Sequence, residues 1–248
     1  MQMKNKKLWV VGIGPGKIEE MTIRAKDVLA ECDVIAGYTV YCNLVMPYFP
    51  EKDYISTPMM QEEKRVQMAL EKADEGYEVA LICSGDAGVY GMAGLALAAS
   101  KDYPQVEVEV IPGVTAALSG AALLGAPLIH DFCLISLSDR LTPMELIEKR
   151  LRAAADADMV IVLYNPESKS RSGYLAHACD VLLEKLPGDR VCGIARNIGR
   201  DGEVKEIMTL EKLKEYSADM FSTVFIGNSS TQNIDDFMVT ARGYKSEQ

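Results

Sequence analysis

The sequence predicts an α/β protein made of two α/β domains with mostly parallel sheets. Short apolar runs rich in β-branched residues alternate with longer stretches of helical periodicity, as in strand–helix–strand units. Glycine-rich turns follow several of these runs. The alternation starts again after a small-residue stretch that ends in Leu124-Gly125-Ala126-Pro127. We therefore expect an N-terminal domain over 1–125, a C-terminal domain over 126–248, and a ligand-binding trough between them.

The first domain is expected to begin with a strand over 8–13. Thr22 can cap a helix that runs to Leu29. A second helix fits 61–75, and Gly76 can end it in a left-handed conformation. Periodicity predicts further strands over 79–83 and 106–111, and further helices over 92–100 and 115–124.

The second domain repeats this alternation. Apolar runs predict strands over 132–136, 160–164, 191–195 and 223–226. Helical periodicity covers 143–155, 173–185 and 210–216. Thr142 and Pro143 fit the N-cap and the first position of a helix.

Composition excludes several classes of partner. Asp and Glu number 36 against 26 Lys and Arg, a net charge of −10, which argues against nucleic acid and anionic membranes. No apolar run approaches the ~18 residues of a membrane span. The six cysteines form no CxxC pair, so we expect reduced thiols in a cytoplasmic protein and no zinc or iron–sulfur site.

The first predicted strand ends in a glycine-rich turn that fits neither common nucleotide motif. Its sequence is GIGPG over 12–16. The dinucleotide fingerprint needs glycine where Lys17 stands, and the phosphate-binding loop needs other residues than Val11 and Ile18. Pro15 also lacks a backbone N–H. A tight strand-to-helix turn is the alternative to a ligand site here.

Two more glycine turns follow predicted strands, SGDAGVYGM over 84–92 and PGVTAA over 112–117. Asp86 can accept hydrogen bonds from a ligand hydroxyl or ammonium group, or it can cap the helix that follows. The carboxyl ends of parallel strands are where open α/β sheets bind ligands. Three such turns in one half of the chain therefore predict a binding site.

These motifs resemble those of the tetrapyrrole methylases, S-adenosylmethionine-dependent enzymes of cobalamin and sirohaem synthesis. The similarity spans nearly the whole chain. It narrows to the C17-methyltransferase branch, which acts on precorrin-3B or cobalt-factor III, through a group of further motifs: HDF (130–132), SLSD (136–139), LTP (141–143), YNP (164–166), RGY (242–244) and the Gly37–Arg65 segment. The resemblance implies methylation at C17, contraction of the macrocycle, S-adenosylmethionine in the trough, and a homodimer.

The resemblance also implies cofactor contacts, residue by residue. In the first domain they are Pro15, Gly85, Asp86, Val89, Thr115 and Ala116. In the second domain they are Tyr164, Asn165, Gly193 and Thr223. Ala87 stands where the family often has proline, and its small size is compatible with binding.

Methyl transfer from a sulfonium is an in-line displacement that needs alignment and neither a metal nor a covalent nucleophile. Ring contraction moves protons, so we expect an acid and a base; His130 and Asp131 are the candidates, with Asp139 and Tyr90 behind them. The implied substrate carries about seven or eight acid groups, so basic residues must line its site within a Debye length, ~8–10 Å. The candidates are Arg65, Arg140, Lys169, Arg171, Arg196 and Arg200.

Two alternatives remain open. The first is a tetrapyrrole methylase that acts at another position or on uroporphyrinogen III. The second is a non-catalytic corrinoid-binding protein, which could dispense with the cofactor turns. Arg65 could also belong to a solvated helix face.

Overall fold

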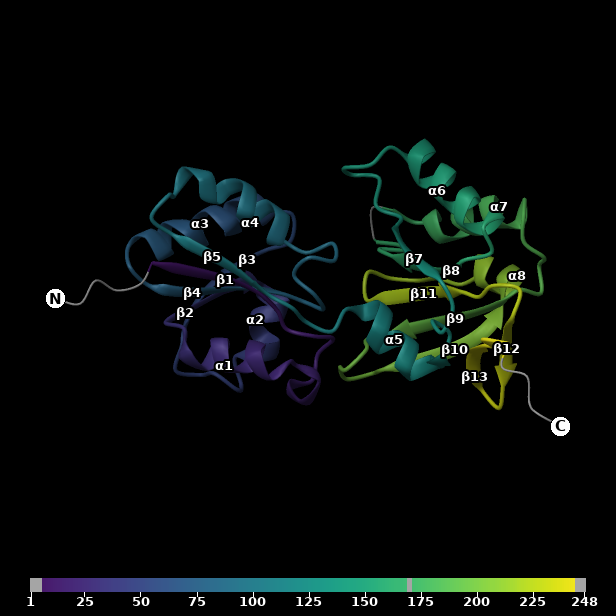
Figure 1. Ribbon diagram of the computed structural model, residues 1–248, viewed down its shortest axis with the longest axis horizontal. Helices are drawn as coiled ribbons and strands as arrows, with labels where there is room; N and C mark the ends of the chain where they lie inside the picture. Colours follow the sequence, from purple (N-terminus) through teal and green to yellow (C-terminus); the bar gives the residue numbers. More distant parts are fainter. Residues whose placement is uncertain (1–5, 169–170, 244–248) are drawn as a thin grey trace. The chain divides into compact units, whose positions relative to one another are not determined.

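The computed structural model describes residues 6–168 and 171–243 (Figure 1). The chain divides into two compact units, Met1–Ala116 and Ala117–Gln248. This boundary precedes the expected break at residue 125, because helix α5 (Ala116–Leu124) packs inside the second unit. A Cβ atom on Gly120 of α5 would lie 2.9 Å from the Phe225 ring. The small residues of α5 therefore serve close packing.

The first unit holds a five-stranded sheet in which every pair of neighbours is parallel, as predicted. Its order is β3-β2-β4-β1-β5. The strands are β1 (Lys7–Gly12), β2 (Val34–Tyr38), β3 (Asp53–Thr57), β4 (Glu78–Cys83) and β5 (Glu107–Ile111). The sequence analysis predicted three of these and missed β2 and β3, which are short and contain glycine or polar residues.

Helices cover both faces of this sheet. α3 (Glu62–Asp74) and α4 (Ala93–Ala99) pack on one face, and α1 (Ile23–Glu31) and α2 (Thr39–Val45) on the other (Figure 1). Alternate residues of β1 serve the two cores: Val10 packs toward α3 and α4, Val11 toward α1 and α2. The chain therefore leaves the neighbouring strands β1 and β4 toward opposite faces, an arrangement that opens a crevice at their carboxyl ends.

The second unit differs from the mostly parallel prediction. Its sheet has the order β10-β9-β11-β8-β7, and only β7 (Phe132–Ser136) and β8 (Val160–Tyr164) pair in parallel. β9 (Val191–Arg196), β10 (Val204–Thr209) and β11 (Ser222–Ile226) enter antiparallel pairs. The physical reason is the short turn over 197–203, which folds β10 back on β9 as a hairpin.

One face of the second sheet is covered by α6 (Met144–Asp156), α7 (Tyr174–Leu183) and α8 (Leu210–Lys214) around a buried aliphatic core. The other face carries α5 and a small sheet of β12 (Thr231–Ile234), β13 (Phe237–Thr240) and β6 (Gly125–Ala126). The start of α6 differs from the prediction: Pro143 is itself the N-cap, and its carbonyl accepts from Leu146 and Ile147.

The six cysteines are free, and five of them are buried. Burial raises the pKa of Cys42 and of Cys83 to about 11, so both are neutral thiols at physiological pH. No helix within the described ranges combines the length and the apolar character that crossing a bilayer requires.

The cap of α1 gives a direct test of the local fold. The Thr22 hydroxyl accepts from Ala25 N at 3.2 Å, as predicted, and donates to Pro112 O at 3.2 Å. We expect Thr22→Ala to lower the free energy of unfolding by about 1–2 kcal/mol, measured by urea titration. Thr209→Ala is the matched control, because its cap bond to Lys212 N is longer, 3.4 Å. A loss for Thr22→Ala no larger than that for Thr209→Ala would contradict the assignment.

Candidate functional site

The carboxyl edge of the first sheet is built on three glycine turns that pack backbone against backbone. Gly14 and Gly85 exchange two backbone hydrogen bonds, of 3.0 and 2.7 Å, and both have positive φ. A Cβ atom on Gly12 would lie 2.7 Å from Gly113 N, and one on Gly113 would lie 2.1 Å from Gly85 O. No larger residue fits at these contacts, so the glycines bring the ends of β1, β4 and β5 together.

Asp86 fastens this arrangement. Its Oδ1 accepts from Gly88 N at 2.8 Å and from Val89 N at 3.1 Å, and its Oδ2 accepts from Gly113 N at 2.9 Å. The carboxylate thus orders its own loop and joins it to the turn after β5. Helix α4 begins further on, at Ala93, so Asp86 does not cap it.

The other predicted cofactor residues of the first unit lie at the same edge. Pro15 is buried directly after Gly14, and Val89, Thr115 and Ala116 are half-buried. Thr115 Cα and Ala116 N lie 3.6 Å from the position of a Cβ on Gly85. The space beside Gly88 holds only Asp86 Oδ1 within 4 Å, so a ligand can approach the backbone there. The structure therefore brings all six predicted residues of this unit to one edge.

In the second unit, Tyr164 and Asn165 end β8. The Tyr164 hydroxyl accepts from Ala117 N at 2.7 Å and so caps the first turn of α5. Asn165 has φ 52°, in the left-handed region, and its Nδ2 donates to Ser136 Oγ at 3.0 Å. The same hydroxyl accepts from Ser138 N. The ends of β7 and β8 thus carry a connected polar cluster.

Gly193 and Thr223 have structural surroundings. A Cβ on Gly193 would lie 2.8 Å from Leu124 and 3.1 Å from the Met238 sulfur. Glycine is needed there because α5 and β13 pack directly on β9. Thr223 is 4% exposed in β11 and pairs with Ala195. The described surroundings of these two residues are protein atoms, and their predicted cofactor contact stays a prediction.

Several predicted substrate residues gather at one edge of the second sheet. β7, β8 and β9 run in the same direction, so Ser136, Tyr164 and Arg196 lie at this edge. Arg196 has a buried Nε with no hydrogen-bond partner in the described part of the chain. Arg200 follows in the turn after β9 and lies over the Phe221 ring at 5.4 Å.

Arg171 lies in the loop after β8. It donates to the Ser138 hydroxyl and, at 3.3 Å, to Ser168 Oγ. No ion pair of the described residues includes Arg171 or Arg196, whereas Arg24, Arg152 and Arg190 each bind a carboxylate. Half-buried guanidinium groups with neutral partners are suited to receive an acidic ligand.

The remaining predicted basic residues are dispersed. Arg140 is exposed in the loop after β7. Lys169 lies outside the described residues. Arg65 is 2% exposed inside the first unit, not on a solvated helix face, and its donors are directed at protein acceptors. Direct contact of Arg65 with a substrate is disfavoured by this burial.

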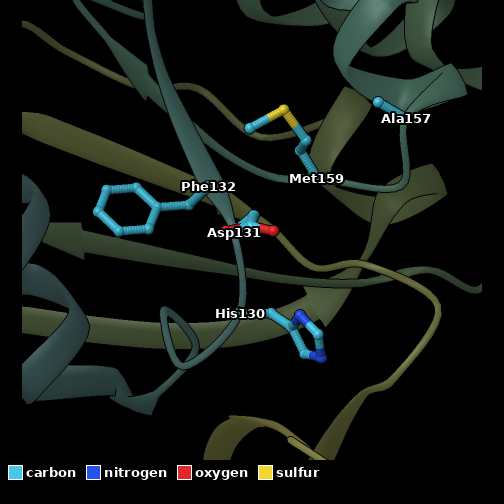
Figure 2. Close-up of a pocket in the computed structure, with 5 residues that line it drawn as sticks. All are labelled: His130, Asp131, Phe132, Ala157 and Met159. Atoms are coloured by element: carbon cyan, nitrogen blue, oxygen red, sulfur yellow. The ribbon is translucent and has the colours of Figure 1, made fainter.

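His130 and Asp131 line a shallow hollow of 470 Å³, together with Phe132, Ala157 and Met159 (Figure 2). The hollow lies at the amino ends of β7 and β8, where Val160 N donates to Asp131 O at 3.1 Å. Ser136 and Tyr164 lie at the opposite ends of these strands, about 13 Å away for five residues. The structure therefore separates the predicted acid–base pair from Tyr164, Asn165 and the arginines of the same unit.

Sequence reasoning missed the packing partners of the site. Gly12 and Gly113 were recognised as turn residues, but their mutual contact depends on the sheet order. Thr57 was not singled out, although its hydroxyl accepts from Arg65 Nε at 2.8 Å. The signal for Arg65 was available: Arg65, Ala69 and Ala73 are spaced by four and form one buried stripe of α3. The described residues contain no cluster of three His, Cys, Asp or Glu suited to a metal ion.

Comparison with known proteins agrees with this architecture. Residues 7–214 match the sequence profile of the Tetrapyrrole (Corrin/Porphyrin) Methylases. A probable cobalt-factor III C(17)-methyltransferase of Salmonella typhimurium is 48% identical over 238 residues, which cover 96% of this chain and 99% of that protein. A precorrin-3B C(17)-methyltransferase of Sinorhizobium sp is 38% identical over 246 residues, covering 96% of each chain.

Solved structures give the same picture. The crystal structure of the methyltransferase CobJ has a TM-score of 0.87 and 35% identity, and the match covers 94% of this chain and 99% of that one. Uroporphyrin-III C-methyltransferase from Thermus thermophilus, complexed with S-adenosylhomocysteine, has a TM-score of 0.70 and 22% identity, covering 89% and 92%. The latter shows the fold alone.

The packing of the glycine turns can be tested with two alanine substitutions. We expect Gly113→Ala to lower the free energy of unfolding by at least about 2 kcal/mol, because its methyl group would collide with Gly85 O. Gly94→Ala, in exposed α4 with nothing within 4 Å, should be neutral or stabilising by up to about 1 kcal/mol. Denaturant titration measures both, and equal stabilities of the two variants would contradict the proposed packing.

Proposed function

Because this chain belongs to the tetrapyrrole (corrin/porphyrin) methylases, we propose that it methylates C17 of cobalt-factor III with S-adenosylmethionine and contracts the macrocycle, in cobalamin biosynthesis. The observation that carries this proposal is the 48% identity to the Salmonella typhimurium relative over almost the full length of both proteins. The chain is thus a methyltransferase of this family. The alternatives of methylation at another position and of a non-catalytic corrinoid-binding protein have no comparable support.

Cobalt-factor III is preferred to precorrin-3B as the substrate. The relative named for cobalt-factor III is 48% identical, and the one named for precorrin-3B is 38% identical. The difference is moderate, and both substrates share the ring atoms that react. Precorrin-3B is therefore the second candidate.

The carboxyl edge of the first unit fits S-adenosylmethionine, which supplies an electrophilic methyl group when bound. Gly85 and the open side of Gly88 allow a ligand to lie against the backbone. Asp86 holds that backbone through three N–H groups and retains acceptor capacity for a hydroxyl or ammonium group. Pro15, Val89, Thr115 and Ala116 border the same place. Their role is to orient the methyl group and exclude water, worth up to roughly 7–11 kcal/mol for aligned reactants.

The basic residues at the carboxyl edge of the second sheet suit a polycarboxylate. Arg171 presents a guanidinium with neutral hydroxyl partners, and Asn165, Ser136 and Ser138 add amide and hydroxyl groups beside it. Arg140, Lys169, Arg196 and Arg200 remain predicted contacts of the substrate. A local positive surface of this kind allows a chain of net charge −10 to bind an anionic molecule.

A homodimer and a cytoplasmic location remain predictions from the family resemblance and from the cysteine pattern. A monomer mass in light scattering would contradict the first.

The function is tested by incubating the protein with cobalt-factor III and, separately, with precorrin-3B in the presence of methyl-labelled S-adenosylmethionine. We expect a labelled, ring-contracted product from cobalt-factor III by mass spectrometry, at a higher kcat/KM than from precorrin-3B. Binding of a corrinoid without methyl transfer would favour the non-catalytic alternative. A labelled product without contraction would indicate methylation at another position.

The acid–base prediction for His130 and Asp131 is tested by His130→Ala, with His177→Ala as control, since His177 bonds only Glu148 on the surface among the described contacts. The position of His130 at the amino edge of β7 weighs against catalysis, so we expect kcat within about threefold of the wild type for both variants. A hundredfold lower rate of contraction in His130→Ala alone, with methylation intact, would instead support His130 as the acid or base.

A further inference from the structure

Arg65 is a buried guanidinium that joins two loops at the carboxyl edge of the first sheet. Its Nε donates to Thr57 Oγ1 at 2.8 Å, and its Nη2 donates to Pro58 O at 2.9 Å. Its Nη1 donates to the Met92 sulfur at 3.4 Å. The first two acceptors begin the loop after β3, and Met92 ends the loop after β4. A planar guanidinium can span these acceptors at fixed geometry, which a lysine ammonium cannot.

The charge of Arg65 is not neutralised by a nearby acid. None of the ion pairs among residues 6–168 and 171–243 includes it. The side chain is 2% exposed, and its acceptors are a hydroxyl, a carbonyl and a thioether. A buried cation with neutral partners is costly for folding alone. Its positive field at the edge of the sheet favours an anionic ligand nearby.

Each of the two loops holds one bulky residue in the left-handed region. Met60 has φ 68° and Tyr90 has φ 54°. Their side chains are 62% and 53% exposed. Such conformations are unfavourable for residues with a large side chain and persist when the surroundings impose them. Neither side chain is held in this conformation by burial in a core, which points to a role for the exposed groups themselves.

We propose that Met60 and Tyr90 form the surface that receives the apolar face of the tetrapyrrole macrocycle, and that Arg65 is the positioning residue that holds their loops. This inference rests on the proposed function, because it takes the macrocycle as the ligand. A thioether and a phenol ring both pack well on a flat conjugated system. The uncompensated charge of Arg65 complements the carboxylate rim of the same molecule. The two loops follow β3 and β4, at the same edge of the sheet as Gly85 and Asp86.

Glycine substitutions separate this role from a structural one. Glycine adopts positive φ freely, so Met60→Gly and Tyr90→Gly relieve the backbone while removing the side chain. We expect the melting temperature of each variant to stay level or rise by about 1–3 °C. The KM for cobalt-factor III should rise at least fivefold, with kcat and the Kd of S-adenosylhomocysteine within about twofold of the wild type. Asp235→Gly is the matched control, because Asp235 is exposed with φ 48° in the second unit, and its KM should not change.

Arg65 itself is tested with Arg65→Lys and Thr57→Val, against Arg24→Lys, an exposed arginine of the same unit that pairs with Glu109. We expect both test variants to raise the KM for cobalt-factor III at least threefold while the control stays at the wild-type value. If the wild type methylates cobalt-factor III and the glycine variants keep its KM, the macrocycle surface is refuted and the proposed function stands. If the wild type methylates no tetrapyrrole, the proposed function fails first.

Discussion

The close backbone contact of Gly12, Gly85 and Gly113 is the constraint on which the rest of the site depends. It requires positions without a Cβ at the ends of three strands, and it brings those ends within hydrogen-bond reach of one carboxylate, Asp86. The strand order places β1 between β4 and β5, so the three turns become neighbours although they are far apart in the chain. Backbone groups, rather than large side chains, therefore form the floor of the proposed cofactor site. This explains why neither common nucleotide motif is present.

The distribution of arginines resolves the apparent conflict between an acidic chain and an acidic substrate. Arg24, Arg152 and Arg190 pair with carboxylates on the outside of the two units. Arg171 and Arg196, at the carboxyl edge of the second sheet, have no such partner among the described ion pairs. Net charge describes the long-range field of the molecule, whereas recognition depends on charges within about one Debye length, ~8–10 Å. A chain of net charge −10 can thus present a positive surface where its substrate binds.

Strongly apolar strands and glycine turns could be predicted from the sequence, because burial and positive φ leave a local signal. β1, β4 and β8 lie where apolar runs predicted them. β10 was missed, because its alternating Lys205 and Glu206 lie on a partly exposed edge. Strand direction in the second sheet could not be predicted, since it follows from a turn and from pairing across the sheet. Arg65 was misjudged because its charge outweighed its position on the apolar stripe of α3, and the separation of His130 from Asn165 depends on register alone.

The most direct measurement of the central claim, that the three glycine turns form the cofactor site, is amide hydrogen exchange with and without saturating S-adenosylhomocysteine. Slower exchange is predicted in peptides that cover 84–92 and 112–118, where Asp86 already orders the backbone. Peptides that cover the hollow at 128–133 should exchange at an unchanged rate. Protection confined to 128–133, with none over 84–92, would contradict the claim and would make the His130 hollow the binding site instead.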